Sequence, residues 1–199
     1  GTTQLSQPTN MATGAVSEMS ATSAVHQRLV TDISIGGQHF YRSVATIAAQ
    51  TAGALAYAHL RGVIHRDIKP SNLMLDGDGV VWVTDFALAK SDIEEGTLPA
   101  TGDFLGTLRY MSPERFRGQC DARADIYALG MTLYELAVKR PAFQAADRRK
   151  VMYSFNELEP ERPGSLDVGM PRDLETVILK AIDKDPARRY QSAETLAAD

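Results

Sequence analysis

Residues 65–72 form a short run of side chains that could carry chemistry, with the sequence His-Arg-Asp-Ile-Lys-Pro-Ser-Asn. A further acidic position, Asp85, follows two short apolar stretches. Asparagine and carboxylate side chains supply the hard oxygen ligands that Mg²⁺ binds in proteins. Taken singly, Asp67 or Asp85 would be a solvated turn residue, and Asn72 a cap on a backbone turn. Because few unrelated proteins combine an acid, a base, a lysine and an amide at these intervals, the joint pattern indicates an active site.

The pattern His-Arg-Asp-x-Lys-x-x-Asn resembles the catalytic loop of eukaryotic-like (Hanks-type) serine/threonine protein kinases. Asp85 stands where these proteins carry a magnesium-binding aspartate. The resemblance implies that Asp67 is the catalytic base, which accepts the proton of the substrate hydroxyl. It implies that Lys69 neutralises negative charge on the transferred phosphoryl group. Asn72 and Asp85 would then hold the magnesium ions.

Other positions of the resemblance concern the nucleotide and the type of substrate. A lysine at the second position after the aspartate is similar to the serine/threonine-specific subset, in contrast to the tyrosine kinases. Thr107, within Gly-Thr-Leu-Arg-Tyr, matches a threonine that such kinases place beside the base and the lysine. Met74 would form the floor under the adenine and Thr84 would lie next to it, although a methionine between two leucines is more often simple core. ATP and Mg²⁺ are the implied cofactors.

Three further matches extend the resemblance over most of residues 40–199. The triplet Ser-Pro-Glu at 112–114 stands where the family has Ala-Pro-Glu, and Arg189 stands where a late arginine pairs with that glutamate. If buried, this pair would be costly to break, whereas two surface charges would contribute almost nothing. Asp125 matches an aspartate that accepts hydrogen bonds from the backbone of the catalytic loop. Its position near the start of a predicted helix also suits a carboxylate.

Two features of the chain bear on regulation. In kinases with an arginine before the base, here Arg66, that arginine often binds a phosphorylated residue of the activation loop. Thr97 and Thr101 are the candidate phosphorylation sites, with Thr101 slightly preferred, and the alternative is a solvated threonine in a polar loop. Ala87 replaces the family's glycine after Asp-Phe. Because alanine disfavours positive φ, an inactive flipped conformation would be less accessible.

The residues before and around the motif are expected to form one helix and a small hairpin. Apolar residues recur at helical spacing over 40–58, and Gly62 suits the end of that helix. Two short strands are expected at about 73–75 and 80–84. The sequence Asp-Gly-Asp-Gly between them is a hairpin signal, because its glycines can adopt positive φ.

Further helices are expected after a long connection. The polar, acidic stretch at 90–107 has no clear periodicity and is interpreted as a functional loop. Helices are predicted at about 123–138 and 171–182, and Ser192 suits the N-cap of a last one. Gly130, inside the first of these, costs about 1 kcal/mol relative to alanine and therefore suggests close packing. We expect a mainly α fold: the helical C-terminal lobe of an α+β protein kinase, with a small catalytic β-hairpin.

The start of the chain departs from the family pattern. Residues 1–38 are rich in Ser, Thr, Ala and Gln, which predicts a low-complexity, disordered segment before the lobe at 39–199. Nothing upstream of His65 matches the Gly-rich loop and strand lysine with which kinases hold ATP. A Leu-Ala-Val-Lys run ending at Lys139 lies downstream and ends a helical pattern instead. We expect the N-terminal lobe to be absent, the last helix to be truncated, and the isolated chain to bind ATP weakly and transfer negligible phosphate.

Composition excludes several classes of function. The 199 residues are 44% hydrophobic and 23% charged, as in soluble globular proteins. A net charge of −4 gives no electrostatic footprint for nucleic acid, and no apolar run is long enough to span a bilayer. The single cysteine, Cys120, cannot form an internal disulfide, and the first residues do not resemble a secretory signal. We therefore expect a cytoplasmic location.

The predicted function is ATP-dependent phosphoryl transfer to Ser/Thr of protein substrates by the parent protein. The alternative is a pseudokinase or protein-interaction module that uses the lobe as a scaffold. A scaffold needs none of the four residues Asp67, Lys69, Asn72 and Asp85, so their joint presence argues against this alternative. A small-molecule kinase of related fold is disfavoured by the Ser-Pro-Glu segment and the loop before it, which suit a polypeptide substrate. The identity of the substrate and the oligomeric state stay open.

Overall fold

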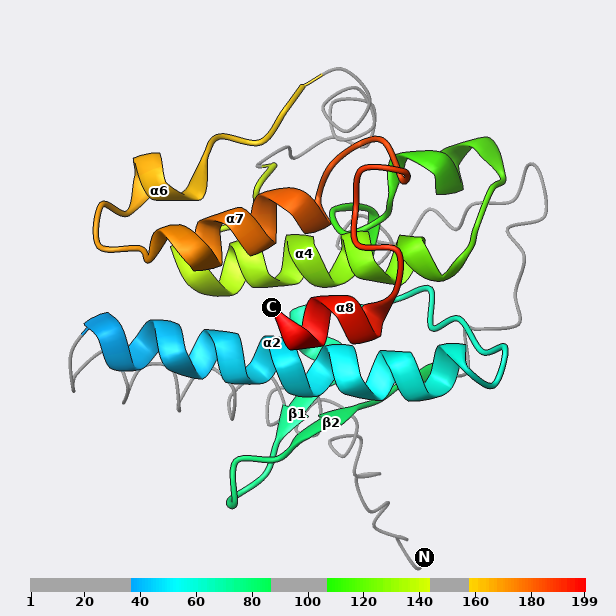
Figure 1. The fold of residues 1–199 in the computed structure, drawn as a ribbon, viewed down its shortest axis with the longest axis horizontal. Helices are drawn as coiled ribbons and strands as arrows, with labels where there is room; N and C mark the ends of the chain where they lie inside the picture. The colour runs from blue at the N-terminus through cyan, green and yellow to red at the C-terminus, as the bar shows by residue number, and fades with distance from the viewer. Residues whose placement is uncertain (1–36, 87–106, 144–157) are drawn as a thin grey trace, which may run out of the picture.

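The computed structural model describes residues 37–86, 107–143 and 158–199, and within them the fold is helix-rich with a two-stranded antiparallel sheet (Figure 1). This agrees with the mainly α fold and small hairpin expected from the sequence. The elements are α2 (Gly37–His59), η1 (Pro70–Asn72), β1 (Leu73–Leu75), β2 (Val81–Val83), η3 (Pro113–Arg117), α4 (Ala122–Val138), α6 (Pro163–Leu166), α7 (Arg172–Ala181) and α8 (Ala193–Ala198).

Several expectations fall on other parts of the chain. Residues 1–36 lie outside the described ranges, so the predicted disorder of the first segment stays a prediction. Ala87, Thr97 and Thr101 lie outside them as well, together with most of the predicted loop at 90–107.

Helix α2 forms one side of the core. Its apolar face packs against α4 and α8. Gly62 adopts φ of 73° just after the helix, and its N–H donates to the carbonyl of His59 at 2.9 Å, as predicted for a helix end. The residues of α2 that are buried are Phe40, Tyr41, Val44, Ile47, Ala48, Thr51, Ala52, Leu55 and Ala58.

Helix α4 is the central helix, and it packs between α2 and α7 (Figure 1). Most of its residues are buried, which explains why its sequence is apolar on nearly every face. Asp121 caps its start by accepting a hydrogen bond from the N–H of Arg123 at 2.8 Å. Lys139 ends it with φ of 60°, and the Lys139 ammonium lies 4.9 Å from the ring centroid of Phe40. Lys139 is exposed and lies at the end of the helix, as expected.

The hairpin lies on the opposite side of α2 from α4 and α7 (Figure 1). Its register pairs Met74 with Trp82. Asp76 closes the turn, because its carboxylate accepts hydrogen bonds from the N–H groups of Asp78 (3.0 Å) and Val80 (2.9 Å) and from the Trp82 indole (2.8 Å). The Trp82 hydrogen bond, followed by the backbone donors, lowers the pKa of Asp76.

One side chain of α2 attaches the hairpin to the helix. The amide oxygen of Gln50 accepts from the N–H of Val81 at 2.8 Å, and its NH₂ group donates to the carbonyl of Gly79 at 3.0 Å. Because both contacts are to the backbone, they fix the position of β2 whatever the side chains of the strand are.

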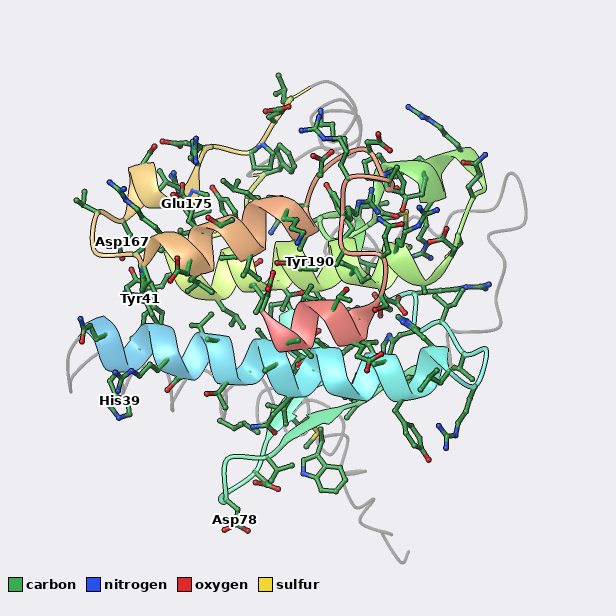
Figure 2. The ribbon with its side chains drawn as sticks, viewed as in Figure 1. His39, Tyr41, Asp78, Asp167, Glu175 and Tyr190 are labelled. Atoms are coloured by element: carbon green, nitrogen blue, oxygen red, sulfur yellow. The ribbon has the colours of Figure 1, made fainter. Side chains whose placement is uncertain are left out.

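Buried tyrosines tie the remaining helices together. Figure 2 shows Tyr41 pointing from α2 toward Asp167, which lies between α6 and α7, and the two side chains are hydrogen-bonded. Burial, followed by this hydrogen bond, raises the pKa of Tyr41. The hydroxyl of Tyr190 donates to Asp199 at 2.7 Å. Ser192 caps α8 by accepting from the N–H of Thr195 at 3.2 Å, as predicted.

No helix in the described ranges is long and apolar enough to cross a bilayer.

At Gly130, α4 approaches the end of α7 closely. A Cβ placed at this position would lie 2.7 Å from both Ala181 Cβ and Ile182 Cγ2. The close packing inferred from the sequence is therefore confirmed, and the absence of a side chain is what allows the two segments to meet.

We predict that Gly130→Ala destabilises the fold by about 1–3 kcal/mol, because overpacking outweighs the gain in helix propensity. Gly53→Ala in α2 is the matched control, since a Cβ there meets nothing within 4 Å. It should stabilise the fold by about 0.5–1 kcal/mol. Urea unfolding of both variants measures the difference, and equal stability of the two would contradict the packing argument.

Candidate active site

Three polar side chains of the predicted site form a cluster with Asp67, which is only 6% exposed. The Lys69 ammonium lies 2.9 Å from Asp67 Oδ2 and also donates to Thr107 Oγ1 at 2.9 Å. The Asn72 amide donates to the same Oδ2 at 3.0 Å and to the main-chain carbonyl of Asp67 at 2.7 Å. The structure thus brings together Asp67, Lys69, Asn72 and Thr107, the last of them from a segment far along the chain.

The local sequence explains how Asn72 is oriented. Pro70 begins the short turn η1, and Asn72 ends it directly before β1. Both contacts of the Asn72 NH₂ group are to oxygens, so the amide must present its nitrogen to Asp67. Its Oδ1 is consequently the atom that could bind a cation, and the hydroxyl of Ser71 is its neighbour at 3.4 Å.

Thr84 connects the hairpin to this cluster. Its N–H donates to the carbonyl of Asn72 at 2.9 Å, and its hydroxyl donates to the same carbonyl at 3.3 Å. The carbonyl of Thr84 accepts from His65 Nε2 at 2.7 Å. Asp85 is the next residue and is exposed, with φ of 65°. The two halves of the predicted site are therefore joined through the backbone of Thr84, directly before Asp85.

His65 is fully buried, and its ring links the loop to the strand end. Nδ1 accepts from the N–H of Asp67 at 3.2 Å, while Nε2 donates to the Thr84 carbonyl. A neutral imidazole with its proton on Nε2 satisfies both hydrogen bonds. Phe86 packs edge-on against this ring, with centroids 4.5 Å apart. His65 thus holds Asp67 and the residues after β2 at a fixed separation.

Asp125 anchors the loop to α4. It is fully buried, and its two oxygens accept from the N–H groups of His65 and Arg66 at 2.7 Å each. Its Oδ2 also accepts from His59 Nε2 at 2.8 Å. The backbone contacts agree with the role that the sequence resemblance implied for Asp125. The contribution of His59, at the end of α2, was not predicted, because 66 residues separate it from Asp125.

The last of the predicted positions, Met74, lies on strand β1 of the hairpin. Met74 is 44% exposed on the hairpin, so it is a surface residue and the simple-core interpretation of it is wrong.

Glu135, in α4, accepts from the Tyr110 hydroxyl at 2.6 Å. Burial, followed by the charge of Glu135, raises the pKa of Tyr110. This contact, which sequence reasoning missed, ties the segment after Thr107 to α4.

The Glu114 carboxylate and the Arg189 guanidinium form a bidentate pair, with N–O distances of 2.7 and 2.8 Å. Arg189 is 3% exposed and also donates to the main-chain carbonyls of Asp183 and Arg123. Burial alone would raise the pKa of Glu114, but the hydrogen bonds and charge of Arg189 lower it below the ordinary value of 4.5. The predicted buried pair is confirmed, and it fixes η3 against the C-terminal part of the chain.

The donor set of the site suits a nucleotide-bound cation better than a metal held by protein alone. In the described ranges, no group of three or more His, Cys, Asp and Glu residues could hold a metal. Mg²⁺ that bridges phosphates needs only one or two oxygen ligands from the protein. The Asn72 amide oxygen and the exposed Asp85 carboxylate are of that kind.

A cavity of about 740 Å³ lies elsewhere, between α2, α7 and α8. It is lined mainly by apolar atoms of these three helices and does not include the residues around Asp67. The cavity is therefore separate from the site.

The fold and the polar cluster together define a protein kinase domain. The protein kinase domain family matches residues 10–199 of the chain, which therefore belongs to that family.

The relatives are serine/threonine kinases of bacteria. The chain is 42% identical over 148 residues to the probable serine/threonine-protein kinase SCO3848 of Streptomyces coelicolor, which covers 73% of this chain and 22% of that protein. It is 38% identical over 154 residues to the serine/threonine-protein kinase PknB of Mycobacterium leprae, covering 77% and 25%. A probable serine/threonine-protein kinase of Corynebacterium efficiens, CE0033, is 38% identical over 182 residues, covering 88% and 28%. The predicted resemblance to eukaryotic-like serine/threonine kinases is confirmed, and the chain spans about a quarter of the length of these relatives.

We predict that Glu114→Gln lowers the free energy of unfolding by on the order of 3 kcal/mol at neutral pH, because Arg189 loses its buried partner. The folded-state pKa of Glu114 is depressed, so its contribution is present above the unfolded pKa and is lost as pH falls through the folded one. The wild-type chain should therefore lose more stability than the variant below about pH 4.5.

Glu161→Gln is the control for this experiment. The Arg140–Glu161 ion pair, with an N–O distance of 3.0 Å, is exposed to solvent and should contribute at most about 1 kcal/mol to stability. Denaturant unfolding at several pH values gives both results. Parallel pH profiles for the wild type and Glu114→Gln would refute the assignment.

Proposed function

We propose that this chain supplies the catalytic, helical lobe of a protein kinase that transfers the γ-phosphoryl group of ATP to Ser/Thr hydroxyls of proteins. The observation that carries the proposal is the contact of Asp67 with both Lys69 and Asn72, with Thr107 completing the cluster. Phosphoryl transfer needs a positioned nucleophile and positive charge where negative charge develops, and this cluster offers both functions.

Asp67 acts as the base in this proposal. Lys69 and Asn72 both contact its Oδ2, and we assign Oδ1 to the proton of the substrate hydroxyl. The two contacts hold the carboxylate in one orientation, which supports general-base catalysis because the acceptor must be within hydrogen-bond reach of the proton. Thr107 keeps the Lys69 ammonium beside the base, where it would neutralise charge on the transferred group.

Asn72 and Asp85 would hold Mg²⁺ through oxygen atoms, and Mg²⁺ when bound would neutralise the phosphates of ATP. The orientation of the Asn72 amide supports this, because its nitrogen is committed to Asp67. Met74 would lie under the adenine, which its exposure on the hairpin permits, and Thr84 would lie beside it.

The proposed organisation divides the chain at about residue 38. We propose that residues 1–38 precede the lobe as a low-complexity segment, and that ATP is held jointly with a second lobe that this sequence does not match. The resemblance to the family supports a cytoplasmic location, since ATP is the phosphoryl donor. Phosphorylation of Thr97 or Thr101, bound by Arg66, would regulate the loop before Thr107.

A pseudokinase or interaction module is the second candidate. The 44% exposure of Met74 and 59% exposure of Trp82 on one face of the hairpin would suit a protein contact. The polar cluster around Asp67 favours catalysis, because burying the Asp67 carboxylate and the Asn72 amide beside the partly exposed Lys69 costs stability that a scaffold has no need to lose.

We predict that the natural gene product containing this chain autophosphorylates with Mg-ATP, and that Asp67→Asn lowers this rate by at least about 10²-fold, because the base is lost. Incorporation of ³²P measures the rate. The isolated 199-residue chain is expected to show negligible transfer.

Asp78→Asn is the matched control, since Asp78 lies at the exposed tip of the hairpin (Figure 2). The autophosphorylation rate of this variant should equal that of the wild type. A gene product without phosphotransfer would favour the scaffold. Full activity of Asp67→Asn would exclude the assigned base.

A further inference from the structure

Arg115 reaches from η3 back to the catalytic loop. Its Nη1 donates to the main-chain carbonyl of Arg66, across 49 positions of sequence. The guanidinium is partly buried, and this burial lowers the pKa of Arg115 below its ordinary value, while the carboxylates of Asp125 and Asp67 act in the opposite direction. The positive charge therefore lies in the field of both carboxylates that define the loop.

The residue that Arg115 contacts has an unusual backbone conformation. Arg66 has φ of 69°, a left-handed conformation that a side chain with a Cβ disfavours. Such a conformation persists only where the surroundings over-determine it. On the amide side, the N–H of Arg66 donates to Asp125 Oδ1 at 2.7 Å. On the carbonyl side, Arg115 is the donor.

Arg115 is itself fixed by its neighbours in η3. Glu114, one residue earlier, is held by the bidentate contact with Arg189. Gly118 ends η3 with φ of 74°, and its N–H donates to the carbonyl of Arg115 at 3.1 Å. These contacts fix the backbone of η3 on both sides of Arg115. The Arg115 guanidinium is therefore preorganised to donate to the catalytic loop.

We propose that Arg115 is a positioning residue for Asp67: it holds the carbonyl of Arg66 while Asp125 holds the amide, so that the residue before the base keeps its left-handed conformation. Its catalytic consequence rests on the proposed function. The Ser-Pro-Glu segment at 112–114 is thereby linked to the geometry of the base. Displacement of η3 would loosen the catalytic loop even with the polar cluster around Asp67 intact.

Amide hydrogen exchange of the 199-residue chain tests the contact without needing activity. In Arg115→Met, exchange of the amides of His65, Arg66 and Asp67 should accelerate about tenfold, because a hydrogen bond from a charged donor is lost. Amides of α4 and α7 should keep their wild-type rates. Arg115→Lys should restore part of the protection, since an ammonium can donate to the same carbonyl.

Arg117→Met is the matched control, because Arg117 lies in the same turn but is exposed, and its exchange should equal that of the wild type. Unchanged exchange at the loop in Arg115→Met would overturn the proposal. A uniform acceleration over the whole chain would do so as well, since it would indicate only a general loss of stability.

The kinetic consequence is measured in the natural gene product. Arg115→Met should lower kcat by about tenfold with little change in the KM for ATP, because the base moves while nucleotide contacts stay. A locally loosened loop with unchanged kcat would contradict positioning of the base. If the wild-type gene product has no activity, the proposed function fails, and the exchange experiment still decides whether Arg115 holds the loop.

Discussion

The arrangement of the site depends on one buried carboxylate, that of Asp125. A charge removed from water must be compensated, and here the compensation comes from the N–H groups of His65 and Arg66 and from the His59 ring. Two of the three donors are backbone N–H groups of the catalytic loop. Because the buried Asp125 carboxylate of α4 needs these hydrogen bonds, the loop backbone is held at a fixed position relative to α4. The central helix of the core thus determines where Asp67 lies.

His65 connects the catalytic loop to the end of the hairpin. This ring accepts from the amide of Asp67 and donates to the carbonyl of Thr84, so the strand end is set relative to the base. The hairpin is independently attached to α2 through Gln50. The catalytic loop and the hairpin are therefore held in register by directional polar bonds as well as by the shared core, which suits a site that must present oxygen ligands at fixed positions.

Local patterns made much of this predictable, and long-range partners account for most of what was missed. The Asp-Gly-Asp-Gly turn, the end of α2 at Gly62 and the close packing at Gly130 each follow from a few adjacent residues. Glu114–Arg189 was predictable because both residues belong to recognisable motifs. His59 and Arg115 belong to no recognisable sequence motif, and their contacts join segments that only the tertiary fold brings together. The short turns η3 and α6 also lack the periodicity from which helices are predicted.

The most direct test of this account detects the anchoring hydrogen bonds themselves. In the ¹³C,¹⁵N-labelled 199-residue chain, through-hydrogen-bond scalar couplings should connect the amide nitrogens of His65 and Arg66 to the side-chain carboxyl carbon of Asp125. The backbone bond from Thr84 to Asn72, at 2.9 Å, supplies an internal reference coupling. Observation of both couplings to Asp125 is the predicted result. A spectrum that shows the reference coupling but neither of these would contradict the claim that α4 positions the catalytic loop.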